Sequence, residues 1–220
     1  MPVGSYRFHT GVTAFFEMPT SDARAVLPEH LEPIEVCHQR SILSVTAFLF
    51  EDSVVGPYAE IMFSVVVPPA VSDWGQHAKA GFFPFLAATS SEEARRIKSE
   101  RFHFPYHEHS IDAQFIETDE WMRVRVFGAG SPMLDMCVTP GPWKQESHLL
   151  HGFMMNGEQR LRTTLQISGD YTVHENEKGK MTLFPHPITA NVLSQDVSPY
   201  PFREHSFRNG TEIFHELETF

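Results

Sequence analysis

The densest group of reactive side chains in the sequence is the stretch RFHFPYHEHS, residues 101–110. It holds three histidines, His103, His107 and His109, and places Tyr106 directly before His107. Imidazole is a common ligand for zinc and other transition metals, and it titrates nearer to neutral pH than other side chains do. The stretch therefore allows two kinds of chemistry. One is a metal site. The other is proton transfer by His107, with a hydrogen bond from Tyr106 to a substrate carbonyl.

The three histidines share the same parity, so on a straight strand they would lie on one face and could bind a metal together. Pro105 interrupts such a strand, and this spacing is not specific for a metal site. We therefore expect the histidines to be surface or hydrogen-bonded residues, and we predict neither a metal nor a cofactor.

Carboxylates and arginines in strand-like segments supply further candidates. Glu60 follows the turn GPYA, which would fix its direction, and it is a candidate general acid or base. Arg123 and Arg125 alternate with apolar residues, so they could clamp a substrate carboxylate or could simply form the wet face of a sheet. Glu60 could also be an exposed carboxylate in a turn, without a catalytic role.

Composition limits the partners. The chain has 220 residues, 41% of them hydrophobic, and a net charge of −11. An acidic chain is repelled by phosphate backbones and by anionic lipid, so neither nucleic acid nor membrane is an expected partner. The two cysteines, Cys37 and Cys137, are too far apart for a zinc-binding or disulfide motif. The first residues do not resemble a signal peptide, and we expect a cytoplasmic protein.

The hydrophobic pattern mostly has period two, which is typical of half-buried strands. Polar, glycine-containing residues 174–180 indicate a hairpin-like connection between two of these strands. The segments that predict strands are SILSVTAFLF (41–50), IMFSVVV (61–67), WMRVRVF (121–127), RLRTTLQIS (160–168) and KMTLF (180–184).

Helical signals are few. Residues 20–27 offer an N-cap and a short amphipathic turn before a proline. Residues 90–100 are a stronger candidate because Ser90 and Glu93 have capping-box spacing and the acids precede the bases. The pattern predicts one α+β domain over residues 1–220, mainly antiparallel β with a few short helices.

The order of several motifs resembles the acetoacetate decarboxylase superfamily. The opening PVGSYRFH, the helix-and-turn segment DARAVLPEHLEP and the late segment MTLFPHPITANVL are similar to family segments in the same order. Between them, SVTAFLFEDSVVGPYAEIMFSVVV resembles the strand–turn–strand that carries the family's active-site carboxylate, here Glu60. The likeness spans most of the chain. It implies a closed or cone-shaped β-barrel with a small pocket, and a homo-oligomer.

The same resemblance gives the histidine-rich stretch a place. It is similar to the family segment in which a helix runs into an aromatic-Pro-Lys-Lys turn. Aligning Phe104 and Pro105 with the aromatic-Pro pair puts Glu100 near the family glutamate, and Tyr106 and His107 where the family has its two lysines. Neither a phenol nor an imidazole can form the iminium that the first lysine makes in the family.

Another lysine could take over that role. Lys79 and Lys144 border apolar residues that could depress a pKa, whereas Lys98, Lys178 and Lys180 lie in charged or polar segments and are expected to be solvated.

The prediction from sequence is therefore an acetoacetate decarboxylase-like lyase that acts on a small oxo acid or related carboxylate by acid–base chemistry. The alternatives are a binding protein without catalysis, a decarboxylase with a relocated lysine, and metal-dependent chemistry at the histidines. The candidate catalytic residues are Glu60, Tyr106 and His107; the candidate substrate-binding residues are Tyr58, Phe104, Glu100, Arg123 and Arg125.

Overall fold

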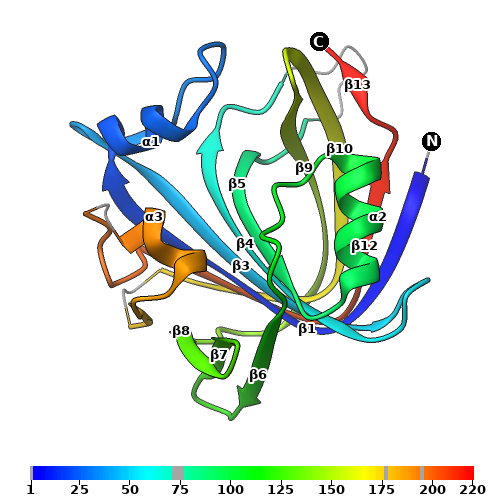
Figure 1. Ribbon diagram of the computed structural model, residues 1–220. Helices are drawn as coiled ribbons and strands as arrows, with labels where there is room; N and C mark the ends of the chain where they lie inside the picture. Colours follow the sequence, from blue (N-terminus) through cyan, green and yellow to red (C-terminus); the bar gives the residue numbers. More distant parts are fainter. Residues whose placement is uncertain (1, 71–76, 176–177, 194–195) are drawn as a thin grey trace.

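The computed structural model describes residues 2–70, 77–175, 178–193 and 196–220 (Figure 1). Strands dominate this part of the chain, and the few helices are short. In chain order the elements are β1 (Pro2–Pro19), α1 (Thr20–Val26), β2 (Glu35–Cys37), β3 (Arg40–Asp52), β4 (Tyr58–Val67), β5 (Gly81–Thr89), α2 (Glu92–Phe102), β6 (Ile111–Glu117), β7 (Met122–Gly128), β8 (Ser131–Val138), β9 (Lys144–Asn156), β10 (Gln159–His174), β11 (Lys180–Leu183), a 3-10 turn (Pro187–Thr189), α3 (Ala190–Leu193), β12 (Arg203–His215) and β13 (Glu218–Thr219).

Seven strands form a closed barrel. They follow the order β1-β12-β10-β9-β5-β4-β3, and the ring closes because β1 also pairs with β3. All of these pairings are antiparallel except the short parallel contact between β5 and β9. The short strands β2 and β13 flank the ring on β3 and β10. This architecture confirms the predicted fold class.

A second sheet, β11-β8-β7-β6, packs against the barrel. Its strand β7 has the alternation expected from the sequence, with Met122, Val124 and Val126 buried. These side chains join a hydrophobic core that also contains Phe16, Leu43 and other barrel residues. The arginines of β7 lie on the opposite face of this sheet.

The predicted hairpin-like connection at residues 174–180 is wrong. β10 pairs with β9 and β12, whereas β11 pairs with β8 in the second sheet. The segment therefore links two sheets; its residues 176–177 lie outside the described residues. A polar segment with glycine is compatible with many turns, and the choice of partner strand depends on contacts far away in the sequence.

Both predicted helices are present. α2 begins one residue later than predicted, because Ser91 rather than Ser90 is the N-cap and accepts from the Ala94 amide at 3.2 Å. The Ser90 hydroxyl instead accepts from the Ala59 amide. None of the described helices is long and apolar enough to span a membrane.

The stretch 101–110 is not a strand that carries three histidines on one face. α2 ends at Phe102, and His103 follows in the left-handed conformation with φ 56°. Tyr106 then forms a single β-bridge with Ala87 of β5. Because of this turn, the parity argument for the three histidines does not hold.

Candidate functional site

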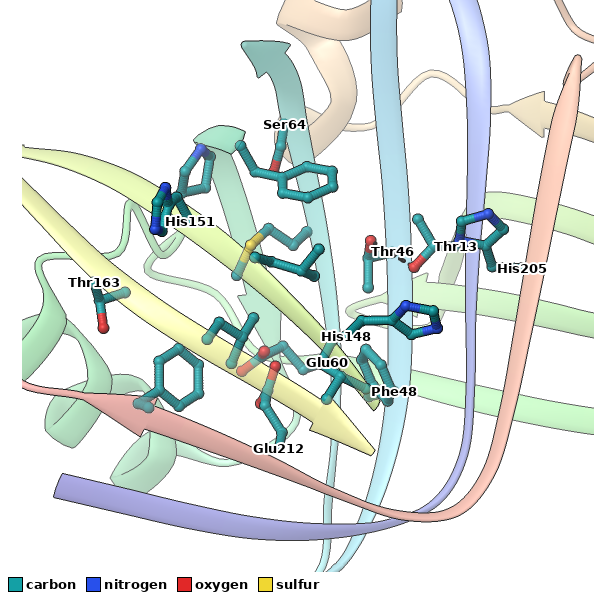
Figure 2. Close-up of a pocket in the computed structure, with 18 of the residues that line it drawn as sticks. Thr13, Thr46, Phe48, Glu60, Ser64, His148, His151, Thr163, His205 and Glu212 are labelled. Carbon is teal, nitrogen blue, oxygen red and sulfur yellow. Dashed lines mark hydrogen bonds between the residues drawn. The ribbon is translucent and has the colours of Figure 1, made fainter. Parts of the chain in front are cut away.

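A cavity of about 110 Å³ lies inside the barrel (Figure 2). Its wall is largely apolar, with aromatic side chains such as Phe48, Phe82 and Phe104. Cavities of this kind, apolar with a few polar groups, are typical binding sites for small molecules. The titratable side chains that line the cavity are Glu60, Glu212, His148, His151 and His205.

Lys98 is the most unexpected residue of the site. We predicted a solvated lysine, but its side chain is 0% exposed. Its Nζ lies 3.0 Å and 2.8 Å from the two carboxylate oxygens of Glu60. The buried residues of α2 are Ala94, Lys98 and Phe102, spaced four apart, so Lys98 belongs to the inner face of the helix.

Aromatic rings surround the Lys98 ammonium. Its Nζ lies 4.7 Å from the ring centre of Tyr6, 4.8 Å from that of Phe50 and 5.3 Å from that of Phe214. Such rings stabilise a cation that has lost its water. Burial opposes the charge, but Glu60 and the other anionic or polar neighbours raise the pKa of Lys98 well above its ordinary value. Lys98 is therefore an ammonium ion at neutral pH.

Glu212 supplies a second carboxylate, and sequence reasoning missed it. It is 5% exposed, and its Oε2 lies 3.8 Å from Lys98 Nζ. That oxygen accepts no hydrogen bond from the described residues. Burial raises the pKa of Glu212 to about 7; the charge of Glu60 adds to this effect, and Lys98 partly offsets it. Lys98, Glu60 and Glu212 together are called the buried charge cluster below.

Two predicted site residues lie against this cluster. The Tyr106 hydroxyl donates a short hydrogen bond to Glu60 Oε2, and burial and the Glu60 charge raise the pKa of Tyr106. The buried Tyr58 stacks on Phe50 and lies beside Lys98, and burial raises its pKa as well. Both tyrosines are thus protonated phenols. The Tyr106 hydroxyl donates its hydrogen bond to Glu60 and not to a ligand in the cavity.

A second polar group lies elsewhere in the cavity wall. Lys79 Nζ lies 2.5 Å from His148 Nδ1, and both His148 and His205 line the cavity. Burial, with help from nearby cations, lowers the pKa of His205 to about 3 and also lowers that of His148. Both imidazoles are neutral at pH 7. Lys79, His148 and His205 are called the imidazole end below.

Of the predicted residues, Glu60, Tyr58, Tyr106 and Phe104 gather at the cavity or directly behind it. Glu60 is 6% exposed, not an exposed turn carboxylate. Phe104 lines the cavity and packs against Tyr106 and Phe214.

His107 does not join them, although it was predicted as a catalytic residue. Its described interactions are with Ala87, Arg95 and His109, at the outer side of the turn after α2. Burial and the neighbouring His109 lower its pKa, so the predicted protonation near neutral pH is not supported. Its backbone N–H donates to the Ala87 carbonyl of β5, and His107 is not among the residues that line the cavity.

Three predicted substrate-binding residues also lie elsewhere. Glu100 has 63% of its side chain exposed and pairs with Arg96 at 2.9 Å, because it is on the outer face of α2. Arg123 and Arg125 share Asp135 at 2.5 Å and 3.6 Å in the second sheet. The wet-face interpretation of these arginines is therefore the correct one.

Neither Lys144 nor the histidine triplet forms an alternative centre. The exposed Lys144 pairs with Glu146 at 2.8 Å, away from the cavity. In the described part of the chain, no three His, Cys, Asp or Glu residues are placed to hold a metal ion. The hypothesis of a metal bound by His103, His107 and His109 has no support in this geometry.

No family model and no curated sequence matches the chain. Solved structures do match. One acetoacetate decarboxylase has a TM-score of 0.70 at 15% identity and covers all of this chain and 90% of its own. The acetoacetate decarboxylase from Legionella pneumophila subsp. pneumophila str. Philadelphia 1 gives 0.68 at 14%, covering 100% and 88%. The enduracididine biosynthesis enzyme MppR, complexed with pyruvate, gives 0.65 at 11%, covering 100% and 91%.

These likenesses define the fold, which the chain shares with acetoacetate decarboxylase and with MppR. The resemblance inferred from the order of sequence motifs is confirmed at this level.

Proposed function

We propose that the chain is an enzyme that transfers a proton on the carbon next to the carbonyl of a small oxo acid, with Glu212 as the acid–base residue. The observation that carries this proposal is the buried charge cluster, in which a carboxyl group with a pKa of about 7 lines an apolar cavity. A general acid or base works best when its pKa lies near the operating pH. The similarity to MppR, which has been solved with pyruvate bound, supports the class of substrate.

In the proposed step, the Glu212 carboxylate removes a proton from the carbon beside the carbonyl. The electron pair of the broken C–H bond forms a C=C bond, and the carbonyl oxygen takes up the negative charge. The Lys98 ammonium, held between Glu60 and Glu212, contributes a fixed positive charge near that enolate. The protonated Glu212 then returns its proton to carbon, or the enolate expels a leaving group in a lyase reaction.

Glu60 has a different part in this proposal from the one expected from sequence. Both of its oxygens accept from Lys98, and one accepts from Tyr106 as well. Its oxygens are thus occupied by donors of the protein itself and are not free to accept a proton from a ligand. Glu60 therefore keeps Lys98 charged and in place, and it leaves proton transfer to Glu212.

The geometry does not favour an iminium mechanism. Only a neutral amine attacks a carbonyl, and Lys98 is held as an ammonium by two carboxylates. Lys79 is exposed at the imidazole end, and Lys144 pairs with Glu146. We expect no lysine adduct when the protein is incubated with pyruvate or acetoacetate, reduced with borohydride and analysed by mass spectrometry. An adduct on any lysine would restore the decarboxylase chemistry.

The direct test is deuterium exchange. Wild type, Glu212→Gln and Glu60→Gln are incubated in D2O with pyruvate, 2-oxobutanoate and acetoacetate, and loss of the α-proton signals is followed by NMR. We expect the wild type to exchange at least one of these faster than buffer does, with a rate that rises through about pH 7 as Glu212 ionises.

Glu212→Gln should reduce the exchange rate to the buffer level. The variant should still unfold in one cooperative transition, which shows that its fold is retained. Unchanged exchange in Glu212→Gln would refute the assignment. Binding without exchange in the wild type would instead favour a binding protein that lacks catalysis. A single domain over residues 1–220, a homo-oligomeric assembly and a cytoplasmic location belong to the same proposal.

A further inference from the structure

His148 carries a hydrogen-bond donor that the protein itself leaves unused. The residue lies on β9, is 7% exposed and lines the cavity. The Lys79 ammonium lies 2.5 Å from its Nδ1. An ammonium group has only donors, so Nδ1 must accept, and the single proton of the neutral ring lies on Nε2. The ring is neutral because burial and Lys79 lower its pKa.

Nε2 is buried and has no hydrogen-bond partner among the described residues. A buried N–H without an acceptor is costly, and native proteins rarely leave one unless a ligand or water completes it. The neighbours of the ring are Tyr171, with ring centres 4.5 Å apart, and Phe207, at 6.5 Å. Neither ring edge supplies a strong acceptor, so the missing acceptor is expected from the cavity.

The register of the barrel strands aligns this donor with the buried charge cluster. Ile167 of β10 is paired with His148 of β9 on one side and with Glu212 of β12 on the other. The three residues therefore form one row across neighbouring strands, and all three line the cavity. Strands in a sheet are about 4.8 Å apart, so the Cα atoms of His148 and Glu212 are separated by roughly 10 Å. Figure 2 shows both side chains around the same hollow.

The two ends of the cavity differ in charge. With Glu212 ionised, the buried charge cluster holds two carboxylates and one ammonium, a net charge of −1, whereas the imidazole end has the Lys79 cation behind a neutral His148 and a neutral His205. A ligand carboxylate is repelled by the first and attracted by the second. The cavity, of about 110 Å³, is of a size for a small ligand.

We propose that His148 determines specificity for a small monoanionic oxo acid, whose carboxylate accepts from His148 Nε2–H while the carbon that loses its proton lies toward Glu212. Lys79 is a positioning residue that fixes the tautomer of His148. This inference rests on the proposed function, because it orients the substrate of the same site.

Binding measurements test the role of His148 without requiring turnover. Pyruvate is titrated against pyruvamide, a neutral molecule of nearly the same shape, by ligand-observed NMR. The wild type should bind pyruvate more tightly than pyruvamide. In His148→Phe, which keeps a ring but has no donor, the Kd for pyruvate should rise about tenfold or more, while the weak binding of pyruvamide changes little. His148→Gln, which retains an N–H donor, should remain within about threefold of the wild type.

His151→Phe is the matched control. His151 lies on the same strand and lines the same cavity, but its Nδ1 already accepts from the Ala70 amide at 3.1 Å. This variant should retain the preference for pyruvate. An equal loss in both phenylalanine variants, an unchanged Kd in His148→Phe, or no pyruvate binding by the wild type would each overturn the inference.

The tautomer provides a second, spectroscopic measurement. In ¹⁵N NMR spectra of the wild type, His148 should show a protonated Nε2 and an unprotonated Nδ1. Lys79→Met should mix the two tautomers and weaken pyruvate binding, without changing the affinity for pyruvamide. A protonated Nδ1 in the wild type would refute the argument from Lys79.

These outcomes separate the inference from the proposed function. Pyruvate binding that depends on His148 but is not followed by α-proton exchange supports the orientation of the ligand and refutes the enzyme. Exchange that is insensitive to His148 supports the enzyme and refutes the orientation.

Discussion

Two clusters in the protein combine one sign of charge with two of the other, yet they have opposite surroundings. In the barrel, Lys98 lies between Glu60 and Glu212, and all three side chains are nearly inaccessible. In the second sheet, Asp135 lies between Arg123 and Arg125, and all three are partly exposed. The arginine cluster stands out in the sequence because its residues alternate on a strand, whereas Lys98 is one charged residue among many in a helix.

The difference shows that burial, rather than the presence of charge, gives the barrel cluster its chemistry. Water screens the arginine cluster, so its ion pairs contribute little to stability. The hydrogen bond from Arg123 lowers the pKa of Asp135, which keeps that carboxylate charged. In the barrel, water is excluded, and a carboxyl group is shifted to a pKa of about 7. Four variants would break or sharpen this comparison, from the largest expected effect to the smallest.

Lys98→Met should have the largest effect. It leaves Glu60 and Glu212 buried beside each other without their cation, and loss of one partner of a buried ion pair costs about 3–5 kcal/mol of unfolding free energy. Urea unfolding followed by circular dichroism measures this loss of unfolding free energy. Arg96→Met, on the outer face of the same helix, is the matched control and should unfold near the wild-type midpoint. A wild-type midpoint for Lys98→Met would contradict the importance of the buried cation.

The pH dependence of stability should change in Glu212→Gln. The folded pKa of about 7 lies above the ordinary value of 4.5, so between these values the folded state keeps a proton that the unfolded state has released. The contribution of Glu212 is therefore fully present below about pH 4.5 and is lost as pH rises through about 7. It amounts to about 1–3 kcal/mol. The stability of Glu212→Gln relative to the wild type should thus increase over this range. A constant difference from pH 4.5 to 8 would exclude the raised pKa.

Tyr106→Phe should have a moderate effect. It removes the hydroxyl that donates to Glu60 and keeps the ring in its contact with Phe104. A hydrogen bond to a charged group contributes about 1.5–3 kcal/mol, which thermal unfolding can measure. Because Lys98 still binds both Glu60 oxygens, we expect reduced rather than abolished α-proton exchange. Complete loss of exchange, with the fold intact, would instead assign Tyr106 a direct catalytic role.

Arg123→Met should have the smallest effect. Its partner Asp135 keeps a second arginine, and the cluster is open to solvent. We expect an unfolding midpoint near that of the wild type and unchanged pyruvate binding. A large loss of binding would show that the arginines act on the cavity after all, as the sequence pattern had suggested.

The sequence predicted the barrel well because its strands carry their own pattern. Apolar residues alternate along β7 and run almost without a break through β3, and the order of family-like motifs placed Glu60 at the start of β4 and Phe104 after α2. Glu60 was found because a turn that fixes its direction directly precedes it. These patterns are local in the sequence, so they can be recognised without knowing which strands pair.

The rest of the site depends on signals that are weak or are interrupted. Lys98 shares the inner face of α2 with Ala94 and Phe102, but the many exposed charges of the helix hide this spacing. Glu212 follows an irregularity near Asn209, which has φ 47°, where the pairing with β10 shifts register. An extra residue in a strand reverses which side chains point inward, so simple alternation from His205 onward puts Glu212 on the wrong face.

The closure of the barrel by β1 sets an order in which the interior is completed. β1 is paired on one side with β3 and on the other with β12, which is about 200 residues later in the chain. Pairing across such long loops is slow compared with the formation of hairpins such as β3–β4. A chain still lacking β12 can bring Lys98 to Glu60 but not to Glu212, and it leaves one edge of β1 open. The pairing of β12 with β1 therefore has two results at once. It covers the open edge of β1, and it brings the Glu212 carboxyl group beside the Lys98 ammonium ion.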